Sequence, residues 1–303
     1  MEIRDIGYFK EVAEHLNLGR AAHALDLSTT ALSKSLRRLE KSVGAKLVKR
    51  TPKGVELTSA GNALFAQAGR LQLLLDDIKH EATDLGAGRA GHVNVGATPG
   101  VSEYCVSDAF IALLKEAPNV SLRAILMYGI DAASMVQEGK VDFVVNTVRP
   151  VIPPDLVCEQ LFCDYQMVYV AASHPLARRK RVTLADLAKE RWAADIYPAS
   201  WNILCQLFRS NGLEPPRLLL ESNSLEIRQP VIESSNLVMH SASITVQKAT
   251  QRYRLVALQV EGLNLERRFG VYYRKHGYLS PAAQRMIEIL KEQGKVLAAK
   301  VAK

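Results

Sequence analysis

The stretch LSTTALSKSLRRLE, residues 27–40, combines hydroxyl side chains with cations at helical spacing. At about 100° per residue, Leu32, Leu36 and Leu39 fall on one face of a helix, and most of the cations fall on the opposite face. Small hydroxyl groups can hydrogen-bond to base edges, and cations bind phosphate. The stretch therefore predicts a helix, capped by Ser28, that enters a DNA groove with its N-terminal end first.

The predicted DNA contacts divide by their chemistry. Residues near the start of the helix would reach bases, and cations farther along would meet phosphates. The first set is Thr29, Thr30, Ser33 and Lys34, and the second set is Arg37, Arg50 and Lys53. Residues 34–53 hold eight cations against one acid, Glu40. Because a run of cations is also compatible with an ordinary solvated surface, the neighbouring elements have to decide between the two interpretations.

The elements around this helix favour a DNA reader. Apolar residues recur at helical spacing over residues 6–16 and again over 21–25, and alanines in the second segment permit close helix crossing. The short link DLS then brings the third helix across the second. Lys53 and Gly54 lie between two β-prone stretches, as in a hairpin wing. Residues 1–58 are therefore predicted to form a winged helix-turn-helix DNA-binding domain.

Residues 59–88 are predicted to form a long linker helix, capped by Thr58, and a hinge. Apolar residues repeat at alternating spacings of four and three, which is the seam of a coiled coil. The seam residues are Leu64, Ala68, Leu71, Leu75, Ile78, Ala82 and Leu85. GAGRAG, residues 86–91, marks a flexible stop. The narrow seam predicts dimerisation with a second copy of the chain, and the alternative is an amphipathic helix that packs on its own domain.

Residues 89–303 alternate between β-prone and helical segments, which indicates an α/β effector domain. Two such series in succession predict two lobes with a cleft, lobe I over residues 89–161 and 268–303 and lobe II over 162–267. Ligands of open α/β lobes bind beyond the carboxyl ends of the strands, near helix N-termini. Loops at these places supply the candidate ligand contacts, which are Thr98, Ser102, Asn146, Thr147, Ser200, Trp201, Asn202 and Asn223.

These loops carry hydroxyls and amides but few charges, and the nearest cation in sequence is Arg149. An anion would then be held mainly by backbone amides and neutral donors. Trp201 and Tyr128 could stack on a ring, although both are also compatible with ordinary packing. The loops therefore predict a small, singly charged organic acid as the effector and tilt the interpretation toward an aromatic one.

The sequence resembles the LysR-type transcriptional regulators. The resemblance runs through the paired alanines, the LS…ALSKSLRRLE helix, VGAKLVKRT and LTSAG, all in the family's order. It departs from the family pattern at residues 18–20, at Thr29 and Thr30, and at Val48. The resemblance implies a regulator that binds double-stranded DNA as a dimer or tetramer, joined through the linker helix. It also implies a two-lobed effector domain built like a periplasmic binding protein.

Composition and motifs bear on the other functional classes. The chain has 303 residues, 48% of them hydrophobic, and a net charge of +8. No apolar run approaches the length of a membrane span, so we expect a cytoplasmic protein without a membrane partner. No nucleophile elbow, HExxH motif or phosphate loop is present, so we expect no enzyme, no catalytic residue and no cofactor.

The four cysteines, Cys105, Cys158, Cys163 and Cys205, leave one further alternative open. Their spacing fits no zinc site, so we expect no metal ligands. Cys158 and Cys163 are close enough in sequence to suggest a thiol redox switch. No cation adjoins either of them to lower the pKa of its thiol, which weighs against that alternative.

Overall fold

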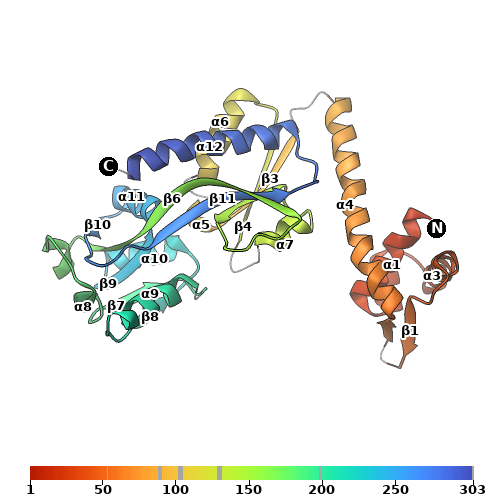
Figure 1. Cartoon of the computed structure of the whole chain (residues 1–303), viewed down its shortest axis with the longest axis horizontal. Helices are drawn as coiled ribbons and strands as arrows, with labels where there is room; N and C mark the ends of the chain where they lie inside the picture. Colours follow the sequence, from red (N-terminus) through yellow and green to blue (C-terminus); the bar gives the residue numbers. More distant parts are fainter. Residues whose placement is uncertain (53, 88–90, 102–104, 128–131, 198, 302–303) are drawn as a thin grey trace. The chain divides into compact units, whose positions relative to one another are not determined.

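The computed structural model describes residues 1–52, 54–87, 91–101, 105–127, 132–197 and 199–301. Lys53, Ser102 and Tyr128 therefore lie outside the described residues. The chain divides into two compact units, Met1–Thr83 and Asp84–Lys303 (Figure 1). Within the described ranges, no helix is both long and apolar enough to cross a bilayer.

The N-terminal unit is a three-helix domain with a β-hairpin. Its helices are α1 (Ile3–His15), α2 (Leu18–Ala24) and α3 (Thr29–Val43), and its hairpin strands are β1 (Val48–Thr51) and β2 (Gly54–Leu57). The Asn17 side chain caps α2, and the Ser28 hydroxyl caps α3 by accepting from the Ala31 amide at 3.1 Å. Phe9, Leu32 and Leu39 are buried between the helices. The winged helix-turn-helix fold predicted from the sequence is confirmed.

The hairpin is fixed to the end of α1. The amide of Val55 donates to the carbonyl of Leu16 at 2.9 Å, which ties β2 to the loop after α1. At Gly54, φ is +137°, and a Cβ atom there would lie 2.5 Å from the Leu16 oxygen. Only glycine accommodates both this backbone conformation and this close approach. The glycine predicted in the wing therefore sets the position of the hairpin beside the helices.

Helix α4 (Ser59–Ala87) begins as predicted, because the Thr58 hydroxyl accepts from the Gly61 amide at 3.0 Å. Its first half packs on its own domain: Ala68 is buried in the N-terminal core, and Leu64 and Leu71 are packed against that core. Farther along, Leu74 and Ile78 are each 54% exposed. The first half of the helix thus packs on its own domain, whereas large apolar side chains are exposed in the second half, at Ile78 of the predicted seam and at Leu74 beside it.

The C-terminal unit contains one long sheet with the strand order β4-β3-β5-β11-β6-β9-β7-β8, and β10 pairs with β6. Lobe I holds β3 (His92–Ala97), β4 (Ser121–Leu126), β5 (Phe143–Thr147), β11 (Glu266–Arg274) and the first part of β6 (Leu156–Ala171). Its helices are α5 (Pro99–Val101), α6 (Ser107–Glu116), α7 (Ala132–Gln137) and α12 (Pro281–Val301). Strands β3, β4 and β5 run parallel to one another, and α12 and α6 contribute to the core of the lobe.

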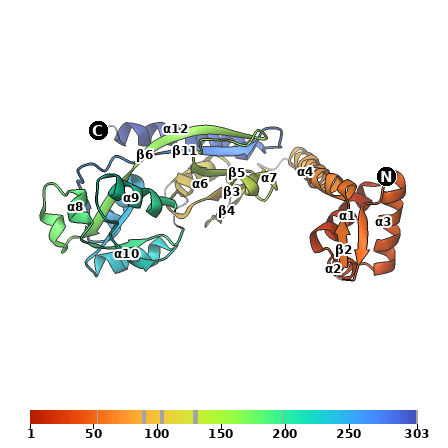
Figure 2. The same cartoon turned by 60° about the horizontal axis from the view of Figure 1, so that its bottom comes forward.

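Lobe II continues the same sheet. Its strands are the second part of β6, β7 (Arg191–Ala194), β8 (Arg217–Glu221), β9 (Leu237–Ala242) and β10 (Leu255–Leu258). Its helices are the 3-10 helix Pro175–Arg178, α8 (Leu184–Leu187), α9 (Ala199–Ser210), α10 (Leu225–Glu233) and α11 (Ser243–Arg252). Trp192, Leu204 and Phe208 are among its fully buried side chains. Figure 2 shows β6 running through both lobes.

Two features differ from the sequence prediction. The predicted boundary between the lobes, after residue 161, falls within a single strand, β6, which pairs with β11 up to Tyr165 and with β9 from Gln166 onward. The chain therefore passes between the lobes near residue 165. Helix α11 was not predicted, because its cap is not local: the carboxylate of Asp164, on β6, accepts from the amide and the hydroxyl of Ser243.

Candidate functional site

The N-terminal unit presents the predicted DNA-contacting residues on one helix and the adjoining hairpin. Helix α3 buries its leucines and leaves Thr29, Thr30, Lys34 and Arg37 exposed, while Ser33 is half-buried. Arg50, on β1, is exposed and donates from its guanidinium to the Ser33 hydroxyl at 3.4 Å. The hairpin arginine thus reaches the predicted base-reading face. Hydroxyls and cations lie together there, as a groove-binding surface requires.

Two of the eight cations in residues 34–53 form ion pairs within the domain, so they are not available to bind phosphate in the way that the sequence alone suggested. Arg38 donates from Nε to the buried carboxylate of Asp5 at 2.8 Å, and that carboxylate also accepts from the Ser35 hydroxyl. Lys46 pairs with Glu40 at 2.7 Å. Hydrogen bonding from Arg38 lowers the pKa of Asp5 below its ordinary value, so the carboxylate stays charged. Arg38, one of the eight cations in residues 34–53, therefore holds α3 to α1.

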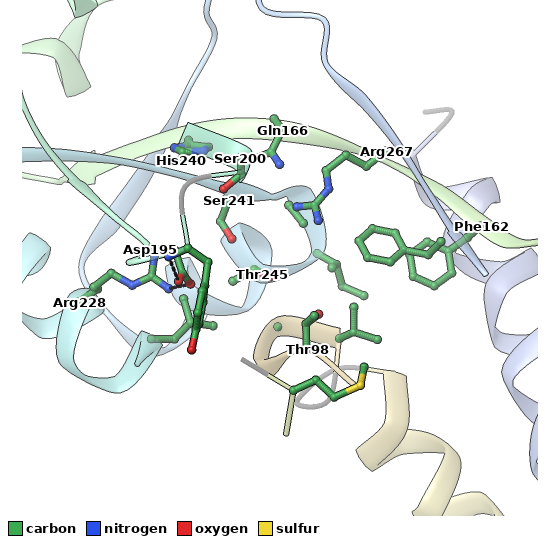
Figure 3. A pocket seen from close by; sticks show the side chains of 18 residues that line it. Thr98, Phe162, Gln166, Asp195, Ser200, Arg228, His240, Ser241, Thr245 and Arg267 are labelled. Atoms are coloured by element: carbon green, nitrogen blue, oxygen red, sulfur yellow. Dashed lines mark hydrogen bonds and ion pairs between the residues drawn. The ribbon is translucent and has the colours of Figure 1, made fainter. Parts of the chain in front are cut away.

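A cavity of about 250 Å³ lies in the C-terminal unit, where several strands end (Figure 3). Thr98 follows β3, Asp195 follows β7, and Ser241 lies near the end of β9. Residues from both lobes line the cavity, because β3 belongs to lobe I and the other two strands belong to lobe II. This is the place at which ligands of open α/β sheets bind.

Arg228 and Arg267 give the cavity its charge. Arg228, on α10, is 5% exposed and forms an ion pair with Asp195 at 3.2 Å. Arg267, on β11, is half-buried, and no described carboxylate lies within ion-pair distance of its guanidinium. Its neighbours are Gln166, whose amide oxygen can accept from it at 2.9 Å, and the ring of Phe269, 5.2 Å from its guanidinium carbon. Burial lowers the pKa of Arg267, but a guanidinium remains charged.

Figure 3 shows the guanidinium of Arg267 and the hydroxyl of Thr98 pointing into the cavity from opposite sides. Asp195 neutralises Arg228, so one positive charge is left without a close partner. Asp164 attracts Arg267 but is itself hydrogen-bonded to the start of α11. A cavity with this balance favours a ligand that brings one negative charge.

The ligand contacts expected from the sequence are only partly brought together. Thr98 and Ser200 line this cavity, and Thr147 lines a neighbouring one, of about 960 Å³, together with Arg149. The Asn146 amide oxygen accepts from the Thr147 amide at 2.8 Å, outside both cavities. Ser102 lies outside the described residues.

Three further candidates, Trp201, Asn202 and Asn223, also lie outside both cavities. Asn202 is exposed on α9, and Asn223 is half-buried before α10. The Trp201 ring packs 5.6 Å from the ring of Trp192, as part of the lobe II core. Packing, the alternative reading of Trp201, is therefore the one that the structure supports.

The sequence predicted an anion held mainly by backbone amides and neutral donors, but this cavity is also lined by two cations, Arg228 and Arg267. Both had a signal in the sequence. On α10, Leu225, Arg228 and Ile232 share the buried face, so a charged residue stands within an apolar stripe. On β11, Arg267 lies on the same face of the sheet as Phe269 and Val271, which are buried, whereas Arg268 lies on the opposite face. Gln166, Thr245 and His240 also line the cavity and were not predicted.

The thiols carry no sign of a redox pair. Cys158 and Cys163 lie five residues apart on the extended strand β6, which separates them by about 16 Å. Burial raises the pKa of both thiols, and it raises the pKa of Cys105 to about 12. Since the thiolate is the reactive form, these cysteines are poor candidates for oxidation at neutral pH. No group of His, Cys, Asp or Glu among the described residues could hold a metal ion.

Two family models match the chain. The model described as "Bacterial regulatory helix-turn-helix protein, lysR family" matches residues 3–62, and the "LysR substrate binding domain" matches residues 86–295. PtxR from Pseudomonas aeruginosa, an HTH-type transcriptional regulator, is 30% identical over 290 residues, covering 94% of this chain and 90% of PtxR.

A regulator from Escherichia coli K12, YnfL, described as uncharacterized, is 34% identical over 193 residues. That match covers 63% of this chain and 64% of the relative, so it spans slightly less than two thirds of YnfL. The crystal structure of full-length CbnR with its target DNA matches with a TM-score of 0.62 and 19% identity, over 96% of this chain and 99% of CbnR. At that identity, the likeness shows the fold alone.

Proposed function

Because this chain belongs to the LysR family of DNA-binding, ligand-responsive transcriptional regulators, we propose that a small, singly charged organic acid controls it from the Arg267 cavity. The observation that carries the proposal is a half-buried guanidinium that faces a cavity and has no described carboxylate partner. Leaving such a charge unpaired is unfavourable, and a bound carboxylate would relieve it.

The mechanism follows from the position of the cavity across two lobes. Thr98 and Met127 belong to lobe I, whereas Arg228 and Thr245 belong to lobe II. A ligand held by both sides favours the conformation in which they are close together, and only such differential affinity can shift a conformational equilibrium. The effector domain would then pass this shift to the DNA-binding domain through α4.

The proposal assigns base reading to Thr29, Thr30, Ser33 and Lys34. Phosphate binding falls to Arg37, Arg50 and Lys53. It also assigns self-association, as a dimer or tetramer, to the second half of α4, because Leu74 and Ile78 are exposed there. The assignment of self-association to this half of α4 is supported by the exposure of Leu74 and Ile78.

The effector proposal is tested by titrating aromatic and aliphatic monocarboxylates into the full-length protein by calorimetry, after a thermal-shift screen. Arg267→Gln should weaken binding of every hit by about tenfold or more, because it removes a charge-assisted bond. Arg268→Gln is the matched control, since Arg268 is exposed on the same strand and pairs with Glu266. Equal affinities for wild type and Arg267→Gln would reject the cavity as the sensor site.

A further inference from the structure

Gln166 lies in the wall of the Arg267 cavity, at the point where β6 passes from lobe I to lobe II. Its backbone amide donates to the carbonyl of Leu265 at 3.0 Å, which holds the residue beside the start of β11, the strand that carries Arg267. The Gln166 side chain is 7% exposed and lies between Ser241 and Arg267 (Figure 3). The backbone thus places this amide side chain next to the guanidinium that faces the cavity.

The two neighbours determine which way the amide of Gln166 points. The backbone carbonyl of Ser241 only accepts hydrogen bonds, and the guanidinium of Arg267 only donates them. The amide nitrogen of Gln166 therefore donates to the Ser241 carbonyl at 3.3 Å, and the amide oxygen accepts from Nη1 of Arg267 at 2.9 Å. Glutamine suits this place because a single amide group both donates and accepts.

The bond to Gln166 orients the guanidinium of Arg267 without neutralising it. An amide oxygen is an uncharged acceptor, so the positive charge of Arg267 remains. Asp164, the register partner of Arg267 on β6, attracts the guanidinium, but its carboxylate accepts from the amide and the hydroxyl of Ser243. Arg267 is therefore held in a fixed direction while its charge stays available to an anion in the cavity.

We propose that Gln166 is a positioning residue that makes the cavity selective for an anionic effector, because its neutral amide orients Arg267 and leaves the charge of Arg267 to the ligand. The inference rests on the proposed function, in which Arg267 binds the carboxylate of the effector. Glutamate has the shape of glutamine but carries a negative charge. Gln166→Glu would therefore place a permanent carboxylate beside Arg267 and take the place of the effector's own charge.

The test measures charge selectivity with ligand pairs of nearly equal shape: benzoate with benzamide, and propionate with propionamide. Each ligand is titrated by calorimetry into the full-length wild type, Gln166→Glu and Gln166→Met. Methionine keeps the length of the side chain but is only a weak acceptor, so it should orient Arg267 less well. Gln160→Glu is the matched control, since Gln160 is exposed on the same strand. Circular dichroism and gel filtration confirm that each variant is folded.

In at least one pair, the wild type should bind the acid about tenfold or more tightly than the amide, because the charge of Arg267 favours a carboxylate. That ratio should fall to about one in Gln166→Glu, through loss of affinity for the acid, and by about threefold in Gln166→Met. Gln160→Glu should leave it unchanged. General damage to the cavity would weaken the acid and the amide alike, so a wild-type ratio in either Gln166 variant overturns the inference.

Thermal unfolding without ligand tests the contact between the two side chains. Gln166→Glu should lower the unfolding temperature more in the Arg267→Gln background than in the wild type, by about 3 °C or more. The reason is that the new buried carboxylate has a guanidinium partner only when Arg267 is present. Equal decreases in both backgrounds would show that the two side chains do not interact, and would overturn the inference.

The two proposals can fail separately. If the acids bind and Arg267→Gln weakens them, but the ratio of acid to amide affinity does not depend on Gln166, then the Gln166 inference fails and the effector site stands. If none of the acids binds the wild type, or Arg267→Gln changes nothing, then the effector site fails and the Gln166 inference fails with it.

Discussion

Arg38 in the N-terminal unit and Arg267 in the C-terminal unit differ in their partners, because only Arg38 pairs with a described carboxylate. Asp5, which is fully buried, accepts hydrogen bonds from Arg38 and from Ser35. The guanidinium of Arg267 contacts an amide and an aromatic ring instead. The difference separates a cation that joins two helices from a cation that is available to a ligand.

Exposed cations without a described carboxylate partner form a third group. Arg37 and Arg50 face solvent, where salt screens their charge and where only a polyanion that contacts several of them at once would bind tightly. A ligand in the cavity does not need several such contacts, because the low dielectric of the cavity walls strengthens a single interaction between a guanidinium and a carboxylate. The two units should therefore respond differently to loss of self-association, to substitution and to salt.

The largest expected effect comes from α4. Leu74→Glu combined with Ile78→Glu places charges on the exposed apolar face and should disrupt self-association. DNA affinity should then fall by about 100-fold or more, since two half-sites are no longer bound together. Effector affinity should stay within about twofold if each cavity acts by itself. Analytical ultracentrifugation, DNA-binding isotherms and calorimetry measure the three quantities.

The control for this variant is Gln72→Glu combined with Thr83→Glu, which adds the same charge at exposed polar positions of the same helix. Leu71 is avoided because it packs on the core of its own domain. A double variant that sediments like the wild type would show that this face of α4 does not mediate assembly.

Lys34→Ala and Ser33→Ala should change which sequences the protein prefers. Each should cost about 1–3 kcal/mol on the specific site, and much less on random DNA, because a base contact is lost. Competition assays with specific and random duplexes measure both losses. Ser33→Ala also frees Arg50 from its 3.4 Å contact, so its loss should exceed that of Thr30→Ala if the contact orients the hairpin arginine. Equal losses on both kinds of DNA would rule out base reading by these residues.

The N-terminal unit could be predicted almost completely because its signals are local. Ser28, Thr58 and Gly54 each act within a few residues of the element they define. Most of the strands and helices of the C-terminal unit were also predicted, but the cap of α11 comes from Asp164, 79 residues away. Pairing at such a distance leaves no periodic trace in a sequence.

The candidate site was predicted less well than the fold. The predicted strand-end loops supply Thr98 and Ser200, but the two cations of the cavity do not come from loops. Arg228 lies inside a helix and Arg267 inside a strand. Their inward direction follows from periodicity, whereas the cavity they meet in depends on how distant elements pack.

Asp5→Asn tests the ion pair between Asp5 and Arg38. Removing the charge should lower the free energy of unfolding by about 1–2 kcal/mol at pH 7, because a charge-assisted bond becomes a neutral one and solvent already screens part of it. The pKa of Asp5 is lower in the folded state, so its stabilising contribution is complete above about pH 4 and is lost as the pH falls through the folded-state pKa.

The stability difference between wild type and Asp5→Asn should accordingly shrink as the pH falls below about 4. Denaturation of residues 1–83 and of the full chain, at pH 7 and at acid pH, measures it. Glu14→Gln, at an exposed position of the same helix, serves as the control. A difference that stays constant down to acid pH would mean that the Asp5 charge does not stabilise the fold.

The smallest expected effect is a change in the salt dependence of ligand affinity. This effect should distinguish the exposed Arg50 from Arg267 in the cavity. Arg50→Ala should reduce the slope of log affinity for DNA against log salt by about one, because one fewer phosphate contact releases counterions. Arg267→Gln should leave that slope unchanged when effector is absent. If Arg267 binds the effector as proposed, effector affinity should vary weakly with salt, because a half-buried guanidinium is less accessible to screening ions. Titrations of both ligands at several salt concentrations measure the slopes. A steep salt dependence of effector binding would place the acid on the open surface and not in the cavity.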